Sequence, residues 1–201
     1  MPYIRRKGIY CIEGKWWPNR IRQDSVKPTL DLLDQSVCYN TPHLHHRTET
    51  KDYTQHLLRE WLQARYAAFP ILVLAFHGRP GQIIVSKGRG ADRYLTLEEI
   101  GDLLAGSCKG CILHFSSCET IDVERPRLEA FLKKTRAAAV SGFRYDIEWL
   151  HSAAFEILYL GALQNYSATA HGMKAVERQM RKIAPTLMRM LGFRIVVRPG
   201  R

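Results

Sequence analysis

Short apolar runs alternate with amphipathic segments along most of the chain. Runs of this length favour strands over helices, and they occur at 9–12, 70–76, 112–116, 137–143 and 193–197. The segment 43–47 is a further candidate strand. The alternation predicts an α/β fold, a three-layer sandwich with a mostly parallel sheet of about six strands and helices on both faces.

The helices are predicted from apolar spacing and from residues that begin or end a helix. They are expected at 28–37, 51–66, 97–106, 126–136, 150–163 and 175–191. Thr50 is a candidate N-cap, and Thr96 to Glu99 has the pattern of a capping box. Gly106 is expected to end the helix that begins after Thr96. Each helix would cover the sheet with its apolar face.

Two local features complete the expected fold. Pro28 would open the first helix after a cap at Asp24 or Ser25. The apolar positions of that helix are Leu30, Leu32, Leu33 and Val37. The segments 82–86 and 93–95 are expected to pair as a hairpin around the loop 87–90, projecting from the end of the sheet.

A chain of 201 residues without an internal repeat is the size of one domain, expected to span 1–201. Its longest apolar stretch, 69–76, is far shorter than the roughly 20 residues that cross a bilayer. The basic N-terminal residues precede no apolar leader core, and five cysteines without a secretory pattern indicate reduced thiols. We therefore expect a cytoplasmic protein without a membrane segment.

Thirty Lys and Arg residues against nineteen Asp and Glu residues give a net charge of +11. Such a surplus attracts nucleic acids, acidic surfaces or anionic small ligands. The basic residues are scattered, however, and neither an RNP motif nor zinc-finger spacing accompanies them. A solvated basic surface is the favoured interpretation, and nucleic acid is not expected as the main partner.

Two strand ends carry residues suited to nucleophilic catalysis. The run 70–76 is followed by His77 and Gly78, and the run 112–116 is followed closely by Cys118. Adjacent parallel strands would bring these ends to one edge of the sheet, where ligands bind in such folds. His77 could take the thiol proton of Cys118, and the backbone N–H groups of Gly78 and Cys118 could form an oxyanion hole.

At these positions the sequence resembles a known family. Residues 71–78, ILVLAFHG, and 111–118, CILHFSSC, resemble the two motifs of the caspase-like (clan CD) cysteine peptidases, a hydrophobic block ending in His-Gly and another ending in Ala-Cys or Ser-Cys. The hairpin and helix between the motifs are similar to the bacterial CHAT-like branch, related to caspases, separases and gingipains. The resemblance covers roughly residues 70 to 163.

The resemblance implies a caspase-like sandwich and a cysteine endopeptidase that cleaves proteins, with Cys118 as nucleophile and His77 as general base and acid. It implies no cofactor and no metal. Relatives of this type act in bacterial defence (anti-phage immunity) or cell-death pathways and await a signal. The expected partners are therefore a protein or peptide substrate and an activator, either an anionic nucleotide-like ligand or an activating protein.

Substrate preference is expected to depend on the segment after the strand 137–143. In separase-like relatives this segment contributes to an acidic pocket for Arg or Lys, and Asp146 is the candidate for that substrate-binding carboxylate. Arg144 would fit the opposite, caspase-like preference for acidic side chains. A surface loop without a role in specificity is the third interpretation.

Other interpretations remain open. The fold could serve as a catalytically inactive interaction module that binds a partner through the basic helix 175–191, or the basic surface could bind a nucleic acid or nucleotide.

Cys108 and Cys111 have metal-ligand spacing and His residues at 43–46 could add ligands, but a second suitable pair is missing. His114 lies within a predicted strand and is expected to be a core or partner-facing residue instead of the base. For Trp16 and Trp17, covering the sheet is favoured over lining a cleft.

Overall fold

A six-stranded sheet forms the centre of the protein in a computed structural model that describes residues 6–17, 24–88 and 90–199. Its strand order is β2-β1-β3-β7-β8-β9, parallel throughout except for β9, which pairs antiparallel with β8. The strands are β1 (Ile9–Glu13), β2 (His43–Arg47), β3 (Ile71–Ala75), β7 (Ile112–Ser116), β8 (Ala139–Gly142) and β9 (Arg194–Val197). The expected sheet of about six strands is confirmed.

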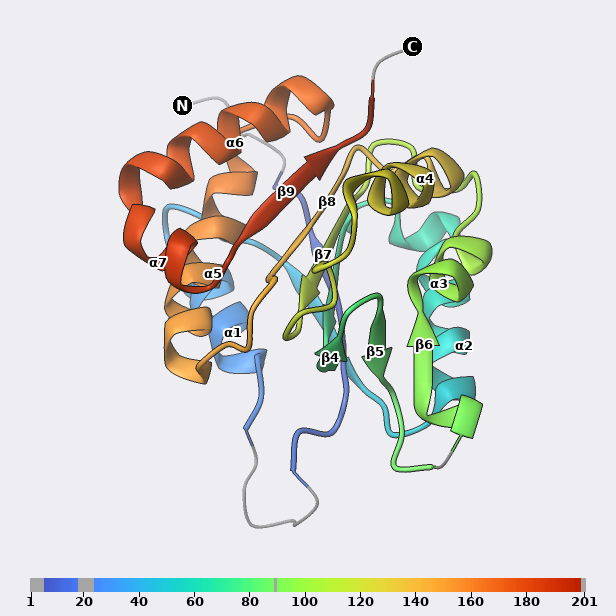
Figure 1. Cartoon of the computed structure of the whole chain (residues 1–201). Helices are drawn as coiled ribbons and strands as arrows, with labels where there is room; N and C mark the ends of the chain where they lie inside the picture. Colours follow the sequence, from blue (N-terminus) through green and yellow to red (C-terminus); the bar gives the residue numbers. More distant parts are fainter. Residues whose placement is uncertain (1–5, 18–23, 89, 200–201) are drawn as a thin grey trace.

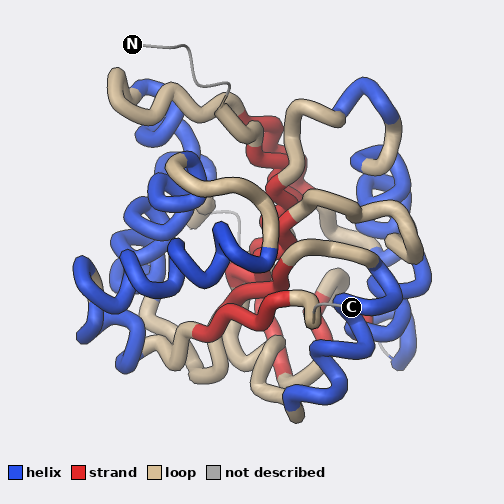
Figure 2. Tube along the Cα trace, turned by 90° about the horizontal axis from the view of Figure 1, so that it is seen from above, coloured by secondary structure: helices blue, strands red, loops and turns tan. Residues whose placement is uncertain are grey.

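Helices cover both faces of this sheet (Figures 1 and 2). The helices are α1 (Lys27–Gln35), α2 (Lys51–Trp61), α3 (Leu97–Leu103), α4 (Arg125–Thr135), α5 (Trp149–Gln164), α6 (Ala170–Ile183) and α7 (Pro185–Met190), with short 3-10 turns at Ala64–Tyr66 and Gly90–Arg93. In Figure 1, α1, α5, α6 and α7 lie on one side and α2, α3 and α4 on the other. The three-layer sandwich predicted from the sequence is therefore present.

The two-residue period of the strands explains the two cores. In β3, Leu72 and Leu74 pack into the cluster formed with α2, α3 and α4, whereas Ile71, Val73 and Ala75 pack against α1, α5 and α6. All five side chains are at most 2% exposed. A strand buried on both faces must be apolar at every position, as its sequence is.

A second, three-stranded sheet lies beyond the carboxyl end of β3. It consists of β4 (His77–Arg79), β5 (Gln82–Ile84) and β6 (Tyr94–Thr96), paired antiparallel in that order. The expected hairpin is confirmed as β5 and β6, but β4 was not predicted. The loop position Arg89 lies outside the described residues, as does Arg5.

Several helix ends follow the sequence signals. Thr50 accepts from the Tyr53 N–H as the N-cap of α2, and Thr96 and Glu99 form the expected capping box of α3, with reciprocal bonds of 3.2 and 2.8 Å. The helix expected over 51–66 is shorter, because α2 ends at Trp61 and a 3-10 turn follows.

Three helix predictions were wrong. The N-cap of α1 is Val26 instead of Asp24 or Ser25, and its side chain forms no capping hydrogen bond. Val37 is 99% exposed and lies beyond α1, while Leu32 is 54% exposed, so the buried face of α1 is formed by Thr29, Leu30 and Leu33. The single helix expected over 175–191 is two helices, because Pro185 cannot continue the helix and instead opens α7.

A polar group of side chains is buried under α5. His114, which is fully buried in β7, contacts Ser141 Oγ at 3.0 Å and Glu156 Oε1 at 3.0 Å. Tyr159 donates to Ser141 Oγ at 2.7 Å. These bonds satisfy the polar atoms where they are shielded from water, so His114 has the core role expected for it.

None of the helices in the described ranges combines the length and the apolar character of a membrane-spanning segment.

The capping box gives a test of the fold. Thr96→Ala removes the hydroxyl that accepts from the Glu99 N–H and is expected to lower the free energy of unfolding by about 1 kcal/mol in chemical denaturation. Thr186→Ala, at an exposed position that is not an N-cap, is the matched control and should change it by less than about 0.5 kcal/mol. Equal losses in both variants would contradict the capping role.

Candidate active site

The parallel register of β3 and β7 brings His77 and Cys118 to the same edge of the sheet. Ala75 of β3 pairs with Ser116 of β7, and each candidate residue follows two positions later. Both line one cleft of about 760 Å³. The expected meeting of these two residues at a sheet edge is therefore what the structure shows.

Gly78 packs directly on the backbone that carries Cys118. A Cβ at Gly78 would collide with the Cys118 carbonyl oxygen and with Thr120 Oγ1. The β4–β5 hairpin is tied to the same turn, because Gly81 donates to the Thr120 carbonyl at 3.0 Å and Thr120 Oγ1 donates to the Gln82 carbonyl at 3.3 Å. Glycine at position 78 is thus required by close approach.

The turn that carries Cys118 is conformationally unusual. Glu119 has a φ of 55°, which places a residue with a bulky side chain in the left-handed region. Ser117 and Thr120 hydroxyls bond to one another at 2.7 Å and hold the turn closed. Local strain of this kind is typical of functional sites, where the surrounding contacts impose it.

The His77 ring is held by a backbone carbonyl. Its Nε2 lies 2.7 Å from the Trp16 carbonyl oxygen, and the two rings meet edge to face with centroids 5.3 Å apart. A carbonyl oxygen can only accept, so Nε2 carries a proton and the neutral ring keeps its lone pair on Nδ1. His77 is therefore presented in the tautomer that can act as a base.

Glu13 fixes the residue that holds His77. This carboxylate is fully buried at the end of β1. It accepts four hydrogen bonds of 2.6 to 2.8 Å, from the Trp16 indole, the Ser25 hydroxyl, the His45 ring and the Val26 N–H. Burial alone would raise the pKa of Glu13, but these hydrogen bonds outweigh it and lower the pKa. Glu13 is therefore a buried anion that positions the Trp16 side chain.

Sequence reasoning missed Glu13. The available signal was the position of this carboxylate directly after the apolar run 9–12. A strand that is buried on both faces rarely ends in a buried charged residue unless that residue forms hydrogen bonds or ion pairs.

The Cys118 thiol faces a carboxylate. It donates to Asp146 Oδ1 at 3.1 Å. Burial raises the pKa of the thiol to about 11; a backbone hydrogen bond from Ile147 opposes the rise, and Asp146 adds to it through its hydrogen bond and its charge. In this arrangement Cys118 is a protonated thiol at neutral pH, and its hydrogen bond goes to Asp146 rather than to His77.

Two N–H groups near the thiol are available to a ligand. The tight turn of the β4–β5 hairpin makes Arg79 and Gln82 a hydrogen-bonded pair. Hydrogen-bonded and non-hydrogen-bonded pairs alternate along an antiparallel ladder, so the next pair, Gly78 and Ile83, is not hydrogen bonded. The Gly78 N–H therefore points away from β5. The Cys118 N–H donates to no backbone carbonyl within the described residues. The geometry is compatible with the oxyanion hole predicted from the sequence, and that role stays a prediction.

The remaining predicted residues are placed as follows. Asp146 lines the cleft beside Cys118, whereas Arg144 lines a neighbouring hollow. Trp16 and Trp17 line the cleft, so the interpretation that they merely cover the sheet is wrong.

Metal binding finds no support in the described parts of the chain, where no three His, Cys, Asp or Glu side chains converge. His43 lies 3.2 Å from Asp31 Oδ1, and His45 binds Glu13. Burial raises the pKa of Cys108 strongly and that of Cys111 to about 11.

A family model covers nearly the whole chain. It matches residues 6–197 and describes a family of unknown function, DUF6642. The chain belongs to this family. A search of the curated proteins found no match for this DUF6642 protein.

The fold of this DUF6642 protein is similar to that of a caspase. The crystal structure of caspase-1 from Spodoptera frugiperda matches with a TM-score of 0.51 and 8% sequence identity, covering 82% of this chain and 73% of the other. At this identity the likeness shows the fold. The mostly parallel six-stranded sheet with helices on both faces is a caspase-like fold.

The role of Glu13 gives a test of the site's architecture. Glu13→Gln removes the charge that strengthens four hydrogen bonds, so the free energy of unfolding is expected to fall by about 2 kcal/mol at neutral pH. Because the folded pKa is lowered, the stabilisation is present above the unfolded pKa of Glu and is lost as the pH falls through the folded value. Denaturant unfolding across pH should therefore show the difference shrinking in acid.

Glu49→Gln is the matched control, since Glu49 lines the same cleft but its ion pair with Lys15 is exposed. It should change stability little. A Glu13→Gln protein as stable as the wild type at neutral pH would contradict a buried, ionised Glu13.

Proposed function

We propose that this protein is a cysteine endopeptidase in which Cys118 is the nucleophile and His77 the general base and acid. The observation that carries the proposal is the arrangement of the two residues at one cleft, with the His77 ring held in the tautomer that leaves Nδ1 unprotonated. The caspase-like fold and the His-Gly and Ser-Cys motifs support the same chemistry. The substrate would be a protein or peptide.

The proposed reaction begins with transfer of the Cys118 proton to His77 Nδ1. The sulfur then forms a bond to the scissile carbonyl carbon, and the electron pair of the carbonyl moves to its oxygen, facing the N–H groups of Gly78 and Cys118. The carbon–nitrogen bond breaks as His77 gives its proton to the leaving amine. Water then attacks the thioester with His77 as base, releasing the acid and restoring the thiol.

The hydrogen bond between Cys118 and Asp146 implies a latent form of the enzyme. A thiol with its pKa raised to about 11 supplies little thiolate at neutral pH, so Asp146 must leave the sulfur before efficient attack. Once released, the Asp146 carboxylate would line the same cleft and could pair with an Arg or Lys side chain of the substrate. An activating ligand or protein, and a place in a bacterial defence or cell-death pathway as in the CHAT-like branch, belong to this proposal.

Substitution of the two reacting residues tests the chemistry. Cys118→Ala and His77→Ala are each expected to abolish cleavage of a protein substrate by the activated protein, because one removes the nucleophile and the other the base. Both variants should keep the wild-type far-ultraviolet circular dichroism spectrum. The readout is release of peptide fragments, measured by mass spectrometry.

Cys111→Ala, which removes a half-buried thiol outside the cleft, is the control and should retain cleavage. Full cleavage by Cys118→Ala would refute the proposal, and a wild-type protein that never cleaves but binds a partner would favour the inactive interaction module.

Substitution of Asp146 separates its two roles. Asp146→Asn keeps the size of the side chain and removes its charge, so the pKa of Cys118 should fall and iodoacetamide should modify Cys118 several-fold faster at mildly alkaline pH. In the same variant, cleavage after Arg and Lys should decrease markedly because the pairing charge is lost.

Glu49→Gln removes an exposed charge that lines the same cleft but does not contribute to the raised pKa of Cys118, and it serves as the comparison. An alkylation rate of Cys118 unchanged by Asp146→Asn would contradict the latent arrangement. A peptide library cleaved mainly after Asp or Glu would refute the assignment of Asp146 to substrate recognition, while leaving Cys118 and His77 in place.

A further inference from the structure

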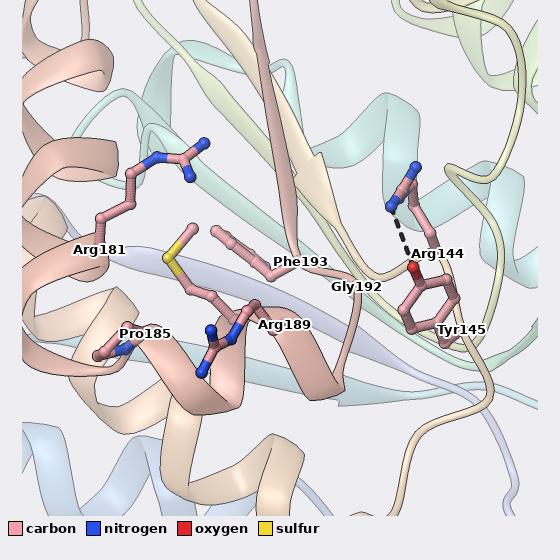
Figure 3. Close-up of a pocket in the computed structure, with 8 residues that line it drawn as sticks. Arg144, Tyr145, Arg181, Pro185, Arg189, Gly192 and Phe193 are labelled. Carbon is pink, nitrogen blue, oxygen red and sulfur yellow. Dashed lines mark hydrogen bonds between the residues drawn. The ribbon is translucent and has the colours of Figure 1, made fainter.

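A hollow of about 420 Å³ lies next to the cleft and is rich in arginine (Figure 3). Its three guanidinium groups come from separate elements: Arg144 from the β8–α5 loop, Arg181 from α6 and Arg189 from α7. Figure 3 shows Arg181 directed toward Phe193, with Arg144 and Tyr145 on the other side of Gly192. Residues distant in sequence thus place three positive charges around one concavity.

The positive charges in this hollow are poorly balanced. Arg181 pairs with Glu177 at 2.7 Å, but Arg144 donates only to the neutral hydroxyl of Tyr145 at 3.2 Å. Arg189 has no carboxylate partner among the described residues. The half-buried Arg194, which lies outside the hollow, donates to a backbone carbonyl. Its pKa is lowered by burial and by the charges of Arg144 and Arg125, and the opposing charges of Asp122 and Glu124 do not cancel this lowering. An anion would relieve this repulsion.

The floor of the hollow is apolar. Met188 and Phe193, both at most 8% exposed, lie beneath the arginines, and the Tyr145 ring closes one side. The Tyr145 ring packs against Gly192, where a Cβ would lie 2.8 Å from it and where φ is +58°. The hollow therefore offers a flat apolar surface next to forked cationic donors, in a volume typical of small-molecule sites.

We propose that this hollow binds a small phosphate-bearing molecule with a flat apolar body, and that its occupancy is transmitted to Cys118 through the segment Arg144-Tyr145-Asp146. The guanidinium fork matches phosphate oxygens in a bidentate manner, and the apolar floor suits an aromatic or similar body. An extended acidic peptide would need a longer groove than a hollow of this size supplies.

The transmission follows from the contacts of this segment. A phosphate that binds Arg144 competes with the Tyr145 hydroxyl for its guanidinium. Tyr145 is adjacent to Asp146, which accepts from the Cys118 thiol, and the Tyr145 carbonyl accepts from the Glu119 N–H at 3.3 Å. Displacement of Tyr145 would therefore disturb both the Asp146 carboxylate that binds the thiol and the Glu119 N–H next to Cys118. Binding is expected to release Cys118 from Asp146 and expose the thiol.

The binding test uses ATP and inorganic pyrophosphate in isothermal titration calorimetry with the full chain. Both probes should bind the wild-type protein, ATP more tightly because of its flat base. Arg189→Gln and Arg181→Gln should each weaken binding about tenfold. Arg178→Gln, which removes the same charge from an exposed site on α6 outside the hollow, should leave the affinity unchanged.

Absence of binding at millimolar probe would overturn the proposed site, as would equal weakening by Arg178→Gln, which would indicate unspecific attraction to a basic surface. Binding of a capped oligoglutamate peptide by the same arginines, with neither phosphate probe bound, would assign the hollow to an acidic protein partner and would also overturn the site.

The transmission test uses the alkylation rate of Cys118 and requires no peptide cleavage, so its outcome is independent of the proposed peptidase activity. Saturating ATP should accelerate modification of Cys118 by iodoacetamide about threefold or more in the wild type and have no such effect in Arg144→Gln. The exposed Cys38 is the internal reference and should react at a constant rate. If the alkylation rate of Cys118 did not change with ATP bound, the proposed transmission would be refuted, while the proposed binding site would still stand.

Discussion

The close contact between Gly78 and the Cys118 backbone is the constraint on which the candidate site depends. Parallel pairing of β3 with β7 brings the two chain segments out at the same edge, and only a residue without a side chain at position 78 lets them approach further. The bonds from Thr120 to the β4–β5 hairpin then hold the two segments together. Cys118, His77 and the N–H groups of Gly78 and Cys118 converge because the backbone can pack this closely.

Two carboxylates, the buried Glu13 and the exposed Asp146, act on this site in opposite directions. Glu13 fixes Trp16, whose carbonyl holds the His77 ring with Nδ1 unprotonated. Asp146 holds the Cys118 thiol in its protonated form. In the mechanism that we propose, the base is thus prepared while the nucleophile is suppressed. A site arranged in this way can be stable and inactive until the Asp146 segment moves, and that segment begins in the arginine-rich hollow.

The sequence predicted the features that depend on local pattern. The strands at 71–75 and 112–116, the N-cap Thr50 and the capping box at Thr96 follow from apolar runs and hydrogen-bonding side chains within a few residues. The placement of His77 and Cys118 at one edge of the sheet followed from the rule for strand ends in parallel sheets together with a family resemblance.

Features set by tertiary contacts were not predictable in the same way. The exposure of Val37 and Leu32 depends on where α1 ends and which face it buries, and β4 is too short and too polar to show a period. Glu13 and the hollow around Arg144, Arg181 and Arg189 combine residues that only the fold brings together. Pro185 is a visible break in the sequence, and its effect outweighs the apolar spacing that predicts one helix over 175–191.

The most direct test of the account is capture of the acyl-enzyme. The protein is incubated with an activated peptide thioester, quenched in acid and analysed by intact mass and peptide mapping. The account predicts one acyl group on Cys118, formed by the wild type and lost in His77→Ala. Acylation confined to the exposed Cys38, or none in any condition that opens the Asp146 segment, would contradict it.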